Sequence, residues 1–259
     1  MTIGHSCFGH GVERVMVFPG LPGDHSFFEA MLPGVDRELF SYVFMDYRGI
    51  GFSRDTLGDY TLAELTGDAV DLANSLGWDS FHIVGHSIGA LVAQRLALDH
   101  RARVKSVVAV TPVPANGNPL DAATRSALLG ALGDDGVFFS VAQAFTAGRL
   151  PVAWCRWLLH HTRGNCRSEA LNAYFRLSCE TDFSAEMWGL ETPFLVLLGA
   201  GDPFYTSAMV DDTFRRWLSD LAVEILGSCG HFPMLETPLL LAASIGRFLT
   251  GRRADQQVS

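Results

Sequence analysis

Residues 81–90 read Phe81-His82-Ile83-Val84-Gly85-His86-Ser87-Ile88-Gly89-Ala90: a short β-prone run leads into Gly-x-Ser-x-Gly, and a helical pattern follows at once. On a tight strand-to-helix turn the serine takes a strained backbone conformation, and the chain passes so close to itself that side chains at Gly85 and Gly89 would clash. We therefore expect Ser87 at the carboxyl end of a central strand, above a helix N-terminus that favours negative charge.

On both sides of this stretch, strand patterns alternate with helix patterns. Apolar runs typical of strands buried on both faces lie at 14–18, 41–47, 104–110, 193–199 and 222–226. Helical periodicity lies between them, at 24–32, 61–78, 88–100, 207–221 and 238–249. This alternation predicts an α/β fold with a doubly wound, mostly parallel sheet and right-handed crossovers. Residues 1–14 leave room for at most one weak strand.

The rhythm changes between about Val113 and Leu190, where strand patterns vanish. Helices are expected there at 121–132, 137–145, 151–161 and 168–179. Because strand patterns resume afterwards, we interpret residues 113–190 as a helical insertion, and residues 1–112 and 191–259 as the core that carries it. Its aromatic residues should mostly hold the insertion to the core, and some should line a pocket.

Composition narrows the class of protein. The chain has 259 residues, a hydrophobic fraction of 48% and a net charge of −9 without a Lys/Arg-rich run, so one large core is expected and nucleic acid is not an expected partner. The N-terminus lacks the pattern of a signal peptide, and the apolar run at 194–198 is too short to span a bilayer. The five cysteines show no metal-like spacing. We read them as free thiols in a reducing cytoplasm.

In doubly wound sheets the functional site lies outside the carboxyl ends of the strands. Ser87, Asp202 and His231 follow three different predicted strands, in that chain order. A serine hydroxyl becomes a good nucleophile when an imidazole accepts its proton, and the imidazole needs a carboxylate to fix its tautomer. An oxyanion would need donors, for which the backbone N–H groups of Ile88 and Leu21 are the natural candidates.

Four segments together resemble those of the α/β-hydrolase superfamily, and the resemblance covers nearly the whole chain. Residues 85–89 look like its nucleophile elbow, and residues 46–53 are similar to its D-x-R-G-x-G-x-S turn. Residues 199–203 resemble its acid loop, and residues 230–238, Gly-His-Phe-Pro with Glu236 and Pro238 behind, resemble its histidine loop. The resemblance implies a Ser87–His231–Asp202 triad and makes residues 113–190 a cap that roofs the pocket.

The chain departs from the family pattern in two places. The oxyanion loop usually reads His-Gly, whereas here it reads Pro19-Gly20; the donor is a backbone N–H, so the oxyanion hole can survive while the orientation of Leu21 stays open. The segment before Val15 is short for two strands, so an outer strand is expected to be missing.

Several of these residues also have a simpler, purely structural interpretation. Ser87 could be a helix-terminal serine, His231 a core or surface histidine, and Asp202 a turn residue, although the loop 111–116 after the preceding strand offers no alternative carboxylate. We expect Asp24 and His25 to cap a helix, with a place at the pocket rim as the alternative. His86 should pack under the elbow rather than act as a base, Arg48 should tie its turn to neighbouring loops, and His160-His161 should lie on a solvated helix surface.

The sequence therefore predicts a serine hydrolase that cleaves an apolar ester or lactone through an acyl-enzyme. Hydrolysis of a carbon–carbon bond in a diketone-like substrate, or acyl transfer, would use the same triad, and a non-catalytic ligand-binding role is a further alternative. An Asp nucleophile would suggest epoxide or haloalkane hydrolysis, and Ser87 argues against both. The expected partner is a small-molecule substrate, with no cofactor, metal, nucleic acid or membrane, and the oligomeric state stays open.

Overall fold

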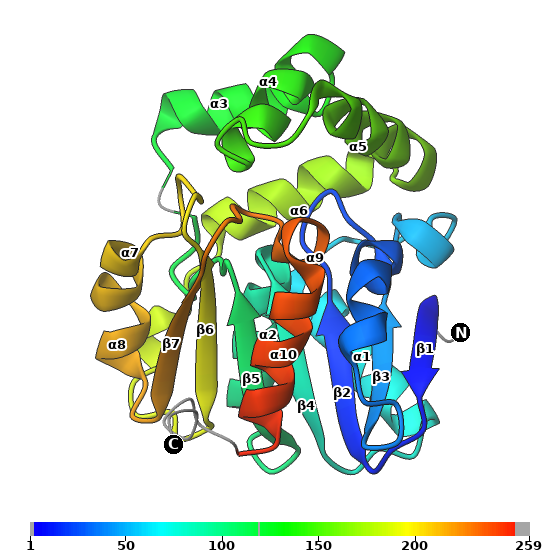
Figure 1. The fold of residues 1–259 in the computed structure, drawn as a ribbon, viewed down its shortest axis with the longest axis vertical. Helices are drawn as coiled ribbons and strands as arrows, with labels where there is room; N and C mark the ends of the chain where they lie inside the picture. Colours follow the sequence, from blue (N-terminus) through cyan, green and yellow to red (C-terminus); the bar gives the residue numbers. More distant parts are fainter. Residues whose placement is uncertain (1–2, 119, 252–259) are drawn as a thin grey trace.

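The computed structural model describes residues 3–118 and 120–251, so residues 1–2 and 252–259 of the predicted core and residue 119 of the predicted cap lie outside the described residues. Within the described part, a seven-stranded sheet has the order β1-β3-β2-β4-β5-β6-β7 (Figure 1). Strand β1 pairs antiparallel with β3, and each other neighbouring pair is parallel. The strands are β1 (His5–Gly9), β2 (Glu13–Phe18), β3 (Phe40–Met45), β4 (Phe81–His86), β5 (Val104–Val110), β6 (Phe194–Gly199) and β7 (Leu221–Leu226).

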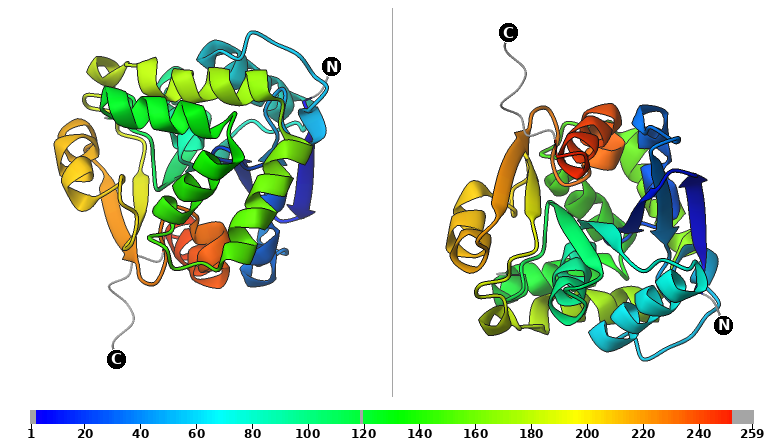
Figure 2. Two further views of the ribbon diagram at one scale, coloured as in Figure 1. Left: turned by 90° about the horizontal axis from the view of Figure 1, so that it is seen from above. Right: turned by 90° about the horizontal axis from the view of Figure 1, so that it is seen from below.

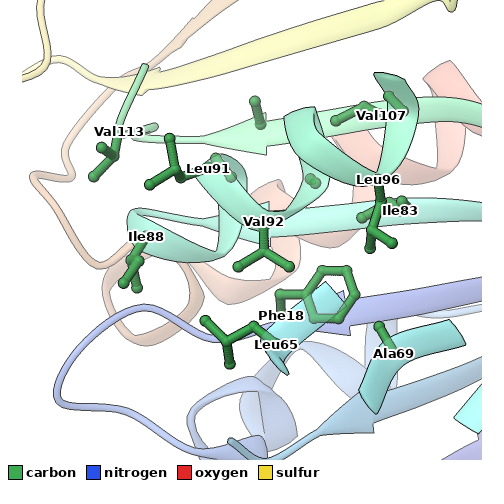
Figure 3. Packing of buried hydrophobic residues seen from close by; sticks show 14 of the residues in the cluster. Phe18, Leu65, Ala69, Ile83, Ile88, Leu91, Val92, Leu96, Val107 and Val113 are labelled. Carbon is green, nitrogen blue, oxygen red and sulfur yellow. The ribbon is translucent and has the colours of Figure 1, made fainter. Parts of the chain in front are cut away.

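Side chains alternate along the strands and so feed two hydrophobic layers. Val15 and Val17 of β2 face the 3₁₀ helix η1 (His25–Gly34) and helix α10 (Pro238–Leu249). Phe18 of β2 faces the opposite layer, with α1 (Leu62–Ser75) and α2 (Ile88–Asp99). In that layer Val92 of α2 lies beside Phe18 and Leu65 (Figure 3). Helix α2, which begins directly after Ser87, is therefore fixed between the sheet and α1.

Most predicted elements are present, with three differences. The helix expected at 24–32 is a 3₁₀ helix that contains Pro33. The helix expected at 207–221 breaks at Thr213 into α7 (Ser207–Asp212) and α8 (Phe214–Trp217), because Thr213 leaves the helical conformation at φ −127° and ψ −91°. The loop before α10 contains a short helix, α9 (Pro233–Glu236). One strand, β1, precedes β2, as the short N-terminal segment predicted.

Between β5 and β6 the chain forms α3 (Ala122–Ala131), α4 (Asp135–Phe145), α5 (Val152–Asn165), α6 (Ser168–Glu180) and the 3₁₀ turn η3 (Ser184–Glu186). Helices α3 to α6 lie over the carboxyl edge of the sheet and cross one another when seen from above (Figures 1 and 2). Helix α6 lies deepest, since its Leu171 and Tyr174 join the same apolar layer as α1 and α2. The inserted helical cap of the predicted fold is thus present, and its bounds of 113 and 190 stay a prediction.

All five cysteines are free, as expected, with Cys7 exposed and the other four buried. Among residues 3–118 and 120–251, no helix combines the length and the apolar character that crossing a membrane would require.

Candidate active site

Ser87 occupies the strained turn that its flanking glycines predict. It has φ 53° and ψ −118° and stands between the end of β4 and the start of α2. A Cβ atom at Gly85 would lie 2.3 Å from the carbonyl oxygen of Gly89, and one at Gly89 would lie 2.3 Å from that of Phe18. The Ser87 N–H donates to the carbonyl of Val110 at 3.0 Å, which ties the turn to β5. Glycine is therefore required at both positions by close backbone approach.

His231 and Asp202 form a buried pair. His231 Nδ1 lies 2.8 Å from Asp202 Oδ2, and their side chains are 3% and 0% exposed. The other carboxylate oxygen of Asp202 accepts from the N–H groups of Phe204, at 2.9 Å, and Tyr205, at 3.2 Å. With Oδ1 occupied in this way, the carboxylate presents Oδ2 to the imidazole, and this arrangement favours the tautomer with the proton on Nδ1 and a free Nε2.

Ser87 and His231 line one cavity of about 100 Å³ beneath the cap. Leu21 and Ile88, the two expected oxyanion donors, line the same cavity. Because Ile88 is the first residue of α2, its N–H has no carbonyl one turn back within the helix. The sequence-predicted nucleophile, base and oxyanion residues thus meet at one place, and Asp202 reaches that place through His231.

The Pro19-Gly20 departure leaves the oxyanion loop firmly held. The Tyr47 hydroxyl donates to the Pro19 carbonyl at 2.7 Å, and the Gly23 N–H donates to the Gly20 carbonyl at 2.7 Å. A Cβ atom at Gly20 would lie 2.7 Å from the Cβ of Ser87, so glycine lets this loop pass directly over Ser87. Leu21 borders the cavity, and the role of its N–H as an oxyanion donor stays a prediction.

His86 lies under the elbow, as expected, and it also connects two loops. Its Nδ1 accepts a hydrogen bond from the Gly20 N–H at 3.2 Å, and its Nε2 lies 2.8 Å from the carbonyl oxygen of His231. The Thr111 hydroxyl donates to the same carbonyl at 3.1 Å. Burial, followed by the nearby charge of His231, lowers the pKa of His86 well below its usual value. His86 is therefore a neutral connector between the oxyanion loop and the histidine loop.

Tyr205 is a site residue that the sequence reasoning missed. Its ring stacks on the His231 imidazole with centroids 5.0 Å apart and planes 23° apart, and its hydroxyl donates to Asn118 Oδ1 at 2.5 Å. Burial, and then the charge of Asp202, raise the pKa of this phenol, while a hydrogen bond with Ser87 acts in the opposite direction. The available signal was its position three residues after Asp202, beyond the first residues after β6.

The cavity wall is mainly apolar and comes largely from the cap. Helices α3, α4, α5 and α6 all contribute to it, and the aromatic lining residues of the cap are Phe138, Phe145 and Phe175. Trp157 and Trp188 are 42% and 62% exposed and contribute nothing to it. Among the lining residues that the structure describes there is no Asp, Glu, Lys or Arg, and the polar ones are Ser87, Asn118, Ser178, Tyr205 and His231.

Asp24 has the capping role that the sequence favours, and a second one. Its Oδ1 accepts from the Ser26 N–H at 2.9 Å at the start of η1, and its Oδ2 lies 3.1 Å from His161 Nε2. The expectation of a solvated surface is therefore wrong for His161, which is half-buried on α5 in contact with the rings of Phe27 and Trp157. His160, its neighbour in the chain, is exposed as expected. The Asp24–His161 contact joins the cap to the core.

His25 and Arg48 support loops near the site. His25 Nδ1 lies 2.6 Å from Asp46 Oδ2, and its ring stacks on Phe52. Arg48 donates to both carboxylate oxygens of Asp68, at 2.8 and 2.7 Å, which confirms its expected structural role. Across the described part of the chain, no group of three or more His, Cys, Asp or Glu side chains could hold a metal ion.

Comparison with known proteins adds to this geometry. A family model described as "alpha/beta hydrolase fold" matches residues 13–238. "Putative carbamate hydrolase RutD" of Caulobacter sp. strain K31 is 27% identical over 258 residues, which covers 93% of this chain and 92% of the relative. Two solved structures, the hydrolase olei00960 from Oleispira antarctica and the esterase EaEST from Exiguobacterium antarcticum, superpose with TM-scores of 0.85 and 0.84. Each is 16% identical and the match covers 96% of this chain and 95% of the other, so the likeness concerns the fold.

Proposed function

The chain belongs to the α/β hydrolase family, and we propose that this hydrolase cleaves a neutral, apolar carboxylic ester or lactone through Ser87, His231 and Asp202. The observation that carries the proposal is the cavity lined by Ser87 and His231, whose described lining is mainly apolar and has no Asp, Glu, Lys or Arg. Placing a charged substrate in such a cavity would cost several kcal/mol of desolvation free energy without a compensating partner.

In the proposed reaction, His231 Nε2 accepts the proton of Ser87 as its hydroxyl oxygen attacks the substrate carbonyl. Asp202 holds the imidazole in the required tautomer and stabilises its cation. The N–H groups of Leu21 and Ile88 would stabilise the oxyanion, and the helix dipole of α2 adds to this stabilisation. His231 then returns the proton to the leaving alcohol, and a water that His231 activates hydrolyses the acyl-enzyme.

Carbamate ester hydrolysis is a second candidate for the same residues. It is favoured by the RutD relative, whose name gives carbamate as its substrate and which aligns over 92% of its length. The cavity lining would suit a neutral carbamate ester better than a carbamate anion, because no Lys or Arg among the described lining residues could pair with the anion. Carbon–carbon bond hydrolysis and acyl transfer also use this arrangement of residues, and analysis of the products separates them from ester cleavage.

The test compares p-nitrophenyl butyrate with p-nitrophenyl hemisuccinate, which has the same acyl length and a terminal carboxylate. We expect turnover of the butyrate, a kcat/KM at least about a hundredfold lower for the hemisuccinate, and labelling by a fluorophosphonate probe. Ser87→Ala should abolish both labelling and turnover, while the exposed Ser219→Ala should change neither. Equal turnover by Ser87→Ala would exclude Ser87 as the nucleophile, and equal rates for the two esters would exclude the neutral-substrate proposal.

A further inference from the structure

The end of α4 and the loop that follows it, residues 145–149, contact the loop that carries His231. The His231 N–H donates to the Phe145 carbonyl at 3.0 Å, and the Phe145 ring lies against the imidazole with centroids 4.7 Å apart. The approach is so close that a Cβ atom at Gly230 would lie 2.5 Å from the Phe145 carbonyl oxygen. The main chain of the cap is therefore a direct neighbour of the proposed base.

Glu236 holds the peptide groups on both sides of His231. Its carboxylate accepts from the Gly230 N–H at 3.0 Å and from the Phe232 N–H at 3.0 Å. The side chain is only 1% exposed, so its charge has little access to solvent. A carboxylate buried in this way needs a compensating positive charge. Removing that positive charge would leave the carboxylate unpaired in the interior.

That positive charge comes from the cap. Arg149 Nη2 lies 2.5 Å from Glu236 Oε2, and its Nε donates to the Thr146 carbonyl at 2.9 Å, which fixes the guanidinium against the end of α4. The same guanidinium packs on the acid loop, since a Cβ atom at Gly201, next to Asp202, would lie 3.2 Å from its Cζ. Arg149 thus touches both of the loops that supply the buried His–Asp pair.

We propose that Arg149 is a positioning residue for the hydrolytic reaction: it pairs with Glu236 and so holds the His231 loop in its working geometry only while the cap is docked. This inference rests on the proposed function, because it assigns His231 the role of base. It makes the cap part of the catalytic apparatus as well as a wall of the substrate cavity. Substrate that stabilises the docked cap would then also stabilise the position of the base.

The test compares Arg149→Ala with Arg163→Ala. Arg163 is a matched control because it also belongs to the cap, is equally exposed at 32%, and pairs with Asp135 of the cap, away from the His231 loop. Arg149→Lys keeps the positive charge, and Glu236→Gln keeps an acceptor for the two N–H groups while removing the ion pair. Melting temperatures show which variants fold.

With p-nitrophenyl butyrate, we expect Arg149→Ala to lower kcat by roughly ten- to a hundredfold with KM within about twofold of wild type. Arg163→Ala should keep the wild-type kcat. Arg149→Lys should recover part of the loss, and added methylguanidinium should partly rescue Arg149→Ala. In the Glu236→Gln background, Arg149→Ala should have little further effect, because the two residues act through one contact.

A second readout does not depend on activity. The proton between His231 Nδ1 and Asp202 should give a downfield proton NMR signal in wild type and in Arg163→Ala, and exchange should broaden that signal in Arg149→Ala. An unchanged signal and kcat in folded Arg149→Ala would overturn the proposal, as would an equal loss in Arg163→Ala. If wild type neither labels nor turns over esters, the proposed function fails, and the NMR comparison alone decides the role of Arg149.

Discussion

The Gly20 N–H donates a hydrogen bond to His86 Nδ1 at 3.2 Å. Since Nδ1 is the acceptor, the proton of the neutral imidazole lies on Nε2, which donates to the His231 carbonyl at 2.8 Å. A single ring thereby sets the spacing between the loop of Leu21 and the loop of His231. The distance across the cavity, from the proposed oxyanion donor Leu21 to the proposed base His231, depends on this ring.

Replacement of this ring should affect both folding and activity. His86→Ala leaves the buried Gly20 N–H without its acceptor, and we expect a loss of about 1–3 kcal/mol in the free energy of unfolding. Ester turnover should fall as well, because the two loops lose their common link. Urea unfolding and kcat/KM measurements check this, with His100→Ala, a half-buried position outside the cavity, as the control. A wild-type kcat/KM in His86→Ala would show that the loops keep their spacing without the ring.

Replacing a glycine of the elbow by alanine should affect stability very differently from replacing a glycine inside a helix. Gly85→Ala brings a Cβ atom within 2.3 Å of a backbone carbonyl, and we expect the protein to unfold or to lose several kcal/mol of stability. Gly67→Ala in α1 and Gly246→Ala in α10 meet no atom within 4 Å, so each should raise stability by about 0.5–1 kcal/mol. Thermal and urea unfolding measure both effects. Similar stability in Gly85→Ala and Gly67→Ala would contradict the close approach at the elbow.

The hydroxyl and the ring of Tyr205 should contribute separately. Tyr205→Phe keeps the stack on His231 but removes the hydrogen bonds of the hydroxyl to Asn118 and Ser87, so we expect kcat/KM to fall by roughly ten- to a hundredfold, the effect of one or two hydrogen bonds. Tyr205→Ala also removes the stack and should lower kcat/KM further. Steady-state kinetics on a p-nitrophenyl ester would show it. Equal kcat/KM values for wild type and Tyr205→Phe would limit the role of Tyr205 to its ring.

The His25–Asp46 contact should make stability depend on pH. Burial acts to lower the pKa of His25, but the hydrogen bond and charge of Asp46 outweigh it and raise the pKa above 6.5. Because the folded state then holds the proton more tightly than the unfolded state, the contribution is complete below pH 6.5 and disappears as pH rises through the raised value. Each tenfold change in proton affinity corresponds to about 1.4 kcal/mol.

Urea unfolding of wild type and His25→Gln should therefore differ more at pH 6 than at pH 9, the wild type being relatively more stable at pH 6. His10→Gln is the control, because the exposed contact between His10 and Glu38 is screened by solvent and should contribute little at either pH. A difference between wild type and His25→Gln that grows with pH would contradict the sign of this linkage.

The sequence predicted the core well because its signals are local. Strands buried on both faces are continuous apolar runs, and the elbow combines two glycines with one serine in five residues. Ser87, Asp202 and His231 each follow a predicted strand, so the rule that sites lie at the carboxyl ends of the strands placed all three at one edge of the sheet without any distances. The Ser87–His231–Asp202 assignment and the bounds of the cap remain predictions; the structure pairs His231 with Asp202 and places Ser87 at the same cavity as His231.

The missed features depend on contacts between distant parts of the chain. His161 pairs with Asp24, 137 positions earlier by their numbers, and nothing in the helical pattern of α5 marks which histidine faces inward. Arg149 and Glu236 are likewise joined only by the packing of the cap on the core. The break at Thr213 was missed because it is a change of backbone conformation, to φ −127° and ψ −91°, which the hydrophobic periodicity of the segment does not reveal.

The cavity has two sources: the groups proposed for chemistry stand on core loops, and most of the apolar wall comes from the cap. Substitutions along α3, α5 and α6 can therefore reshape the wall without moving Ser87 or His231. Changes of sequence in those helices can alter substrate preference while the proposed catalytic residues stay in place. The stretch from Phe145 to Arg149 lacks this freedom, because it also supports the His231 loop. A chimaera that takes its cap from a relative should keep its chemistry when it retains residues 145–149 of this chain.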